Sequence, residues 1–293
     1  MHILLLGNTG QLGWELERSL SPLGTIQALD YPRLNLTEPA SLQPYLRQNP
    51  PQVIINATAY TAVDRAESEE ALARAINTIA PAWLAQEAHR LGAAFIHYST
   101  DYVFDGTKGS PYVESDPPNP LGVYGKSKLD GEQAVEQSAG AYLVLRTSWV
   151  YSLRRDSFVT KVLSWARQQK SLHLVTDQIS GPTWARMLAE ITAQLLSKAG
   201  EQPYEWIAQR RGLYHLAGWG YCSRKAWGEA ILRCDRRPQE QVVQEILPAL
   251  TVDFPTPARR PLFSALDCTR FSQVFGLQLP AWEEALRLAM AVE

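Results

Sequence analysis

The chain has 293 residues, a length that suggests one large domain or two unequal ones. Its 28 Lys and Arg residues against 30 Asp and Glu residues give a formal net charge of −2, so the sequence carries no electrostatic footprint for nucleic acid or anionic lipid. A content of 45% hydrophobic and 20% charged residues excludes disordered and fibrous proteins.

The first half of the sequence alternates short apolar runs with longer amphipathic segments. We predict buried strands over His2–Leu6, Thr25–Leu29, Val53–Asn56, Ala94–Tyr98 and Tyr142–Arg146. The predicted helices between them cover Gln11–Leu20, Pro39–Gln48, Ser68–Leu91 and Tyr124–Gln137. Pro81 should kink or restart the third of these helices. Strands and helices that alternate at this spacing are typical of an α/β fold with a doubly wound, parallel Rossmann sheet.

The second half is less regular. Its predicted helices cover Phe158–Gln169, Ala185–Ala199, Ser223–Arg233 and Trp282–Ala291, and its predicted strands cover Leu172–Thr176 and Tyr214–Ala217. We expect a first domain over residues 1–150 and, over most of residues 151–293, a smaller C-terminal substrate-binding lobe. Strands or helices from residues 151–293 could also pack with the first domain. Ligands of open α/β sheets bind at the carboxyl ends of the strands, where this lobe should lie.

A glycine-rich turn follows the first predicted strand. Gly7, Gly10 and Gly13 form a GxxGxxG pattern that opens a helix. Glycines let the backbone turn tightly and approach a pyrophosphate, and the N-terminus of the helix offers free N–H groups and a positive dipole end. Because the motif directly follows the first strand, it indicates a dinucleotide site and makes residues 1–150 the expected NAD(P)-binding domain.

Two charged residues after the second strand bear on the choice of cofactor. Asp30 ends that strand, where an acid commonly binds the adenosine ribose and favours NAD. Arg33 could instead hold a 2′-phosphate and favour NADP. NADH and NADPH both remain open. Magnesium dependence is not readable from the sequence.

A reactive centre is predicted where the fourth strand and the following helix meet. Tyr124 and Lys128 are four residues apart and therefore share one face of a helix. A neighbouring ammonium would lower the pKa of the phenol, and Lys128 could also bind the nicotinamide ribose. A hydroxyl at the end of the preceding strand, Thr100, could hydrogen-bond the reacting oxygen.

The order of these motifs resembles that of the extended short-chain dehydrogenase/reductase family, and within it the dTDP-4-dehydrorhamnose reductases. The matching segments are spread over nearly the whole chain: GNTGQLGWEL at 7–16, NATAYTAVDRAE at 56–67, HYSTDYVFDG at 97–106, PLGVYGKSKLDGE at 120–132, LRTSWVY at 145–151, DQISGPT at 177–183, GLYHLAG at 212–218 and TPARRP at 256–261. The set STDYVFDG, YGKSKLDGE and RTSWVY is specific to this narrower family.

The resemblance implies an NAD(P)H-dependent enzyme that reduces the C4 ketone of dTDP-4-dehydro-L-rhamnose to dTDP-L-rhamnose. Tyr124 would supply the proton, Lys128 would lower the pKa of the Tyr124 phenol, and Thr100 would hold the carbonyl oxygen. The cofactor contacts implied are Gly10, Gln11, Leu12, Asn35, Leu36, Ala57, Thr58, Ala59, Tyr124 and Lys128. The sugar-nucleotide contacts implied are Thr100, Asp101, Tyr124 and Trp149, and Arg260 could pair with the diphosphate.

Other functions remain as alternatives. The regulatory subunit of methionine adenosyltransferase resembles the same family but acts as a binding partner, and an epimerase or another sugar-nucleotide reductase would carry similar motifs. Sugar-nucleotide 4,6-dehydratases have Asp-Glu where this chain has Asp101 and Tyr102, which disfavours dehydration. Asn35 departs from the Asp that the family often has, and Arg259 departs from its small polar residue.

The remaining expectations concern surroundings and partners. Three cysteines without metal-ligand spacing argue against a metal site and favour a reduced, cytoplasmic protein. The N-terminus lacks the pattern of a signal peptide, and no apolar stretch is long enough to span a membrane. We expect a dTDP-sugar as the small-molecule partner, no nucleic acid and no membrane, and leave a homodimer open.

Overall fold

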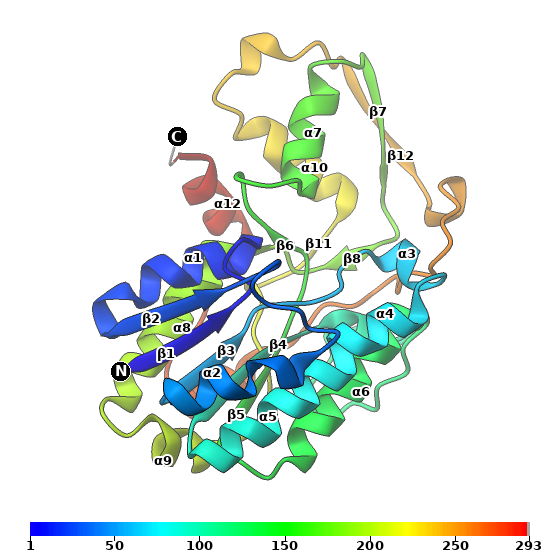
Figure 1. The fold of residues 1–293 in the computed structure, drawn as a ribbon. Helices are drawn as coiled ribbons and strands as arrows, with labels where there is room; N and C mark the ends of the chain where they lie inside the picture. The colour runs from blue at the N-terminus through cyan, green and yellow to red at the C-terminus, as the bar shows by residue number, and fades with distance from the viewer. Residues whose placement is uncertain (292–293) are drawn as a thin grey trace.

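The computed structural model describes residues 1–291, and its centre is a six-stranded sheet (Figure 1). Every neighbouring pair of strands in it is parallel. The predicted doubly wound α/β fold is confirmed. In spatial order the strands are β2 (Thr25–Leu29), β1 (His2–Leu6), β3 (Val53–Asn56), β4 (Ala94–Thr100), β5 (Tyr142–Thr147) and β10 (Gly212–His215).

The strand order reverses at β1. The chain leaves β1 for β2 on one side and then returns to place β3 on the other side. The loops after β1 and β3 therefore diverge at the carboxyl edge of the sheet and leave a crevice between them. Gly7 follows β1 and Ala57 follows β3, so two predicted site segments meet at this switch point.

Helices cover both faces of the sheet because neighbouring strand residues point to opposite sides. Ile3 and Leu5 pack in one core with α1 (Gln11–Leu20) and α8 (Ala185–Ala199). Leu4 and Leu6 pack in another core with α5 (Ala80–Leu91) and α6 (Val123–Gln137). Near-continuous apolar strands are the expected result of burial on both faces.

The long helix predicted over Ser68–Leu91 is interrupted. It consists of α4 (Glu70–Arg74), a π-helical turn over Ala75–Ile79, and α5. The restart expected at Pro81 is confirmed, because α5 begins one residue earlier with this proline in its first turn. The π-helical turn carries the buried Asn77, whose amide hydrogen-bonds the backbone of Tyr60 and the hydroxyl of Ser127 on α6.

A second core lies above the carboxyl edge of the sheet, in the upper part of Figure 1. It surrounds the buried Trp227 and is built by α7 (Phe158–Ala166), α10 (Arg224–Arg233) and α12 (Trp282–Ala291). Beside it, β7 (Ser171–Val175) pairs in parallel with β12 (Glu245–Ala249), a strand that the sequence analysis missed. The predicted strand at Tyr214–Ala217 lies two residues earlier, as β10.

The remaining elements are short. They are α2 (Gln43–Gln48), α3 (Val63–Ala66), β6 (Val150–Tyr151), β8 (Ile179–Ser180), β9 (Thr183–Trp184), α9 (Pro203–Ala208), β11 (Cys222–Ser223) and α11 (Thr269–Phe275). Within residues 1–291, no helix combines the length and apolar character needed to cross a membrane.

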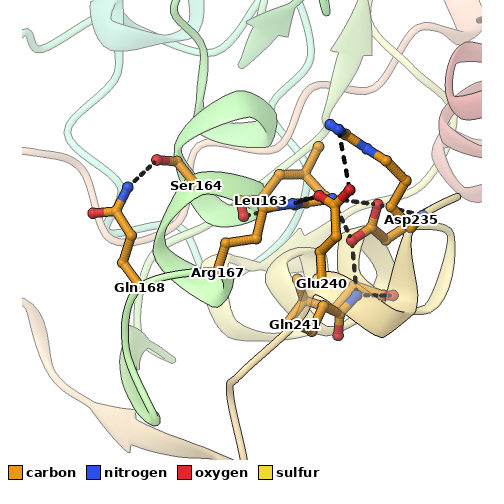
Figure 2. A network of polar contacts seen from close by, with 9 residues as sticks. Leu163, Ser164, Arg167, Gln168, Asp235, Glu240 and Gln241 are labelled. Carbon is orange, nitrogen blue, oxygen red and sulfur yellow. Dashed lines mark hydrogen bonds and ion pairs between the residues drawn. The ribbon is translucent and has the colours of Figure 1, made fainter.

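A polar network ties α7 to the segment after α10 (Figure 2). Arg167, just past α7, donates hydrogen bonds to both carboxylate oxygens of Asp235, at 3.0 and 2.9 Å, and to Glu240 at 2.8 Å. Gln241 donates a further bond to Asp235 at 2.9 Å. Planar guanidinium and carboxylate groups fix direction as well as distance, so the network sets the angle of this segment against α7.

A buried ion pair joins α6 to the sheet. Arg146 on β5 donates two hydrogen bonds to Glu132 on α6, at 2.9 and 2.6 Å. The two side chains are only 4% and 3% exposed. A pair that is already withdrawn from water is costly to break, because the partner left behind is an uncompensated buried charge.

We predict that Glu132→Gln lowers the free energy of unfolding by about 3–5 kcal/mol, the range for removing one member of a buried ion pair. Urea unfolding followed by circular dichroism measures the loss. Glu284→Gln, which breaks the exposed pair with Arg287, serves as the matched control and should leave the unfolding curve unchanged. Equal effects of the two substitutions would contradict the structural role of the buried pair.

Candidate active site

A cavity of about 1070 Å³ opens at the switch point of the sheet. It extends from the loops after β1 and β3, past the ends of β4 and β5, to the first residues of α7 and α10. Most predicted site residues lie on its wall: Gly7, Gly10, Gln11, Leu12, Asp30, Ala57, Thr58, Ala59, Thr100, Asp101, Tyr124, Lys128, Trp149 and Arg260. Gly13, Arg33, Asn35 and Leu36 lie outside this wall.

The glycine loop forms one end of the cavity. A Cβ atom at Gly13 would lie 2.0 Å from the carbonyl oxygen of Gly7, so only glycine permits this approach of α1 to the loop. The helix α1 begins after Gly10, and no side chain within residues 1–291 caps its first turn. The first-turn N–H groups and the positive end of the helix dipole therefore remain available to an anion.

The four predicted contacts after β2 differ in position. Asp30 reaches the cavity wall and accepts hydrogen bonds from the backbone N–H of Thr9, at 3.0 Å, and from its hydroxyl, at 2.5 Å. Arg33 and Asn35 are exposed, and the Asn35 amide oxygen accepts a bond from the Thr37 N–H at 3.1 Å. Leu36 packs into the core beneath the sheet.

Tyr124 stands at the start of α6, beside the end of β4. Gly125 allows this helix to approach the backbone of Tyr102, because a Cβ atom at position 125 would lie only 2.2 Å from the carbonyl oxygen of Tyr102. Burial raises the pKa of the Tyr124 phenol above its ordinary value, and the nearby hydroxyl of Thr100 acts in the opposite direction. The expected lowering of this pKa by Lys128 stays a prediction.

Lys128 lies at the bottom of the cavity, 1% exposed. Its Nζ donates to the Tyr98 carbonyl at 2.6 Å and lies 3.2 Å from Nε2 of His97. Burial lowers the pKa of Lys128 to about 8, while the nearby Glu132 acts to raise it. Sequence reasoning assigned no such contact to His97, because nothing in its spacing from Lys128 along the chain indicates one.

The neighbours of His97 restrict its tautomer. The Asn56 amide oxygen accepts from the Thr58 N–H at 3.1 Å, so the amide nitrogen faces Nδ1 of His97 at 3.2 Å and donates to it. A neutral imidazole that accepts at Nδ1 carries its proton on Nε2. This proton points toward Nζ of Lys128, so it acts against the charged ammonium in the same direction as burial.

Asp101 is the most enclosed acid of the cavity wall. Its carboxylate accepts hydrogen bonds from Ser180 at 3.1 Å and from Ser264 at 2.5 Å. Burial raises the pKa of Asp101 to about 6, although its hydroxyl partners oppose the shift. These serines come from segments far along the chain, and the sequence analysis gave them no role.

The wall near α10 is aromatic and cationic. Trp149 stacks on Trp227, with ring centroids 5.5 Å apart and planes 12° apart. The guanidinium of Arg224 lies 3.5 Å above the Trp149 ring. Arg260 binds both carboxylate oxygens of Asp64, at 3.1 and 2.8 Å. Sequence reasoning did not single out Arg224, because a cation at a helix start is most simply a solvated charge.

Another missed residue reaches the glycine loop from the second half of the chain. Arg154, in the loop after β6, donates to the carbonyl oxygens of Thr9 at 3.0 Å and Gly10 at 3.2 Å. Its guanidinium also lies 4.6 Å from the centre of the Trp14 ring. The loop is thereby fixed from two sides, by Asp30 and by Arg154.

Four buried polar atoms of cavity-wall residues have no hydrogen-bond partner within residues 1–291. They are Oε1 of Gln11, Oγ of Ser99, Oγ1 of Thr147 and Nε1 of Trp227. Buried polar atoms are almost always paired in native proteins, so unpaired ones at a cavity indicate a polar ligand. This fits a dinucleotide at the glycine loop and a second polar molecule beside Tyr124.

Comparison with known proteins agrees with this arrangement. The chain is 41% identical over 293 residues to the dTDP-4-dehydrorhamnose reductase of Burkholderia thailandensis, a match that covers 99% of this chain and 98% of the relative. The crystal structure of a dTDP-4-dehydrorhamnose reductase from Clostridium acetobutylicum superposes with a TM-score of 0.90 at 32% identity, covering 99% and 98% of the two chains.

The structure of dTDP-4-dehydrorhamnose reductase from Bacillus anthracis, in complex with NADP, superposes with a TM-score of 0.88 at 31% identity. The match covers 98% of this chain and 97% of that one. The model of the family described as RmlD substrate binding domain matches residues 1–292. On this match, which extends over both cores, and on its full-length likeness to the reductases, the chain belongs to the RmlD substrate binding domain family.

Proposed function

We propose that the chain reduces the C4 ketone of dTDP-4-dehydro-L-rhamnose to dTDP-L-rhamnose with NADPH or NADH as the hydride donor. The observation that carries this reading is that Tyr124, Lys128 and Thr100 line one cavity together with the glycine loop. The full-length relatives of the chain carry the name of this activity.

The cofactor residues fit a nicotinamide dinucleotide. The uncapped start of α1 would bind the pyrophosphate, and Asp30 would bind the adenosine ribose through its free carboxylate lone pairs. Lys128 would bind the nicotinamide ribose with the protons that Tyr98 leaves free. A bound reduced nicotinamide supplies the hydride that adds to C4 of the sugar.

Tyr124 is protonated at neutral pH, which is the form that a reduction requires. Its raised pKa makes the phenol a weak acid, so the negative charge that develops on the ketone oxygen must drive the proton transfer. As the hydride adds to C4, the ketone oxygen gains negative charge and takes the phenol proton to become the alcohol. The Thr100 hydroxyl, which donates to Asp101 at 3.2 Å, would turn to donate a hydrogen bond to the same oxygen and hold it in place.

The lobe above the sheet would hold the sugar nucleotide. We propose that most of residues 151–293 serve this purpose, with Trp149 and Asp101 at the boundary to the cofactor side. Asp101 is fixed by Ser180 and Ser264 from this half of the chain, so the position of the lobe and the position of the acid depend on each other.

The first test of this function is Tyr124→Phe. We expect kcat for the 4-keto sugar nucleotide to fall about 10²–10⁴-fold, the usual contribution of a general acid, with little change in the Kd for NADPH. Oxidation of NADPH is followed by its nicotinamide absorbance. Tyr204→Phe on α9, which removes a hydroxyl far from the cavity wall, is the matched control. Near-wild-type turnover of the Tyr124 variant would rule out this proton donor.

A second test addresses the choice of cofactor. Arg33 is exposed on the loop three residues after Asp30, where an arginine could meet a 2′-phosphate. We expect Arg33→Ala to weaken NADPH binding by about 1.5–3 kcal/mol, the value of a charge-assisted contact, and to leave NADH binding unchanged. Fluorescence titration with both cofactors measures the difference, and Arg47→Ala on α2 is the control. The same loss for both cofactors would show that Arg33 does not read the phosphate.

A further inference from the structure

Arg224 is the first residue of α10 and lines the cavity beside the reactive centre. Its guanidinium lies 3.5 Å from the centre of the Trp149 ring, 5.0 Å from that of Phe158 and 5.6 Å from that of Trp227. Within the described residues, no side chain or carbonyl forms a hydrogen bond or an ion pair with this guanidinium. The aromatic rings therefore fix the direction of the group without using its N–H donors.

The position is unfavourable for a cation that lacks an anionic partner. Burial lowers the pKa of Arg224 to about 10, because water is largely excluded from around the charge. The start of a helix carries the positive end of the helix dipole, which also disfavours a cation. The nearest acid that acts on it in the cavity, Asp101, is occupied by two serine hydroxyls. An anion bound in the cavity would offset both costs.

The other cations of the wall are less suited to this anion. Arg260 already uses its guanidinium on Asp64, on the hydroxyl of Thr256 and on the carbonyl of Ala258. Arg155 and Lys161 are exposed to water at the cavity, where an ionic contact contributes little. The guanidinium of Arg224 thus combines a position fixed by aromatic rings with N–H donors that have no hydrogen-bond partner within residues 1–291.

The position of Arg224 in the cavity indicates which anion it would bind. The pyrophosphate of a dinucleotide belongs at the glycine loop, at the other end of the cavity. Arg224 lies instead with Asp101 and Trp149, on the side proposed for the sugar nucleotide. A planar guanidinium matches two phosphate oxygens at once, which suits a diphosphate better than a sugar hydroxyl.

We infer that Arg224 binds the diphosphate of the sugar nucleotide and, by covering one face of Trp149, fixes this ring for contact with the sugar. The inference rests on the proposed function and adds a substrate-binding residue to it. Arg260, in contrast, holds the loop that contains it against Asp64 on α3.

Isothermal titration calorimetry of the NADPH-loaded enzyme tests this contact, with dTDP and thymidine as probes. We expect Arg224→Gln to raise the Kd for dTDP at least about tenfold, as the loss of one charge-assisted contact requires, and to leave the Kd for thymidine unchanged. The Kd for NADPH should stay the same. Lys225→Gln is the matched control: it removes a neighbouring charge that pairs with Glu229 on α10, away from the cavity wall, and should change nothing.

Three results would overturn the inference: unchanged dTDP binding, an equal loss for dTDP and thymidine, or an equal loss for NADPH. If Arg260→Gln weakens dTDP and Arg224→Gln does not, the diphosphate contact belongs to Arg260. Should Arg224→Gln fail to fold, Arg224→Lys keeps the charge without the planar fork and should still weaken dTDP, by about threefold or more. A wild-type enzyme that binds NADPH but neither dTDP nor the 4-keto sugar would instead refute the proposed function.

Discussion

The buried ion pair between Glu132 and Arg146 sets the position on which the site depends. It fixes α6, which carries Tyr124 and Lys128, to strand β5 of the sheet. Glu132 also acts to raise the pKa of Lys128, which lies one turn earlier on the same helix. One carboxylate therefore both fixes α6 to the sheet and affects the charge of a site residue. A helix held only by apolar contacts could slide by a fraction of an ångström, whereas paired hydrogen bonds fix its register.

The chemistry of the site depends on two different environments within the cavity beside this helix. The glycine loop offers backbone N–H groups and little side-chain bulk, so it suits a ligand that needs close backbone approach. Around Tyr124, burial by the surrounding protein raises the pKa of the phenol and lowers that of Lys128. The cavity wall thus carries a protonated phenol and an amine of lowered pKa on the same helix.

The sequence predicted what depends on local pattern. Each of these patterns involves residues that are close together in the sequence: the strand and helix periods, the glycine turn, and the spacing of Tyr124 and Lys128. The corresponding segments were predicted near their observed positions. Contacts between distant segments left no such signal: Ser264 on Asp101, Asp64 on Arg260, and β12 beside β7. Residue spacing shows that Tyr124 and Lys128 share a helix face, but it does not show the contacts of the Lys128 amine with Tyr98 and His97.

The sixth strand of the sheet comes from the second half of the chain. Because β10 pairs with β5, the backbone groups on that side of β5 have no partner until residues 212–215 have been made. During synthesis on the ribosome, the nascent N-terminal half therefore exposes an apolar strand edge, the kind of surface that recruits other chains. We therefore expect a shortened gene product that ends near residue 150 to be prone to aggregate.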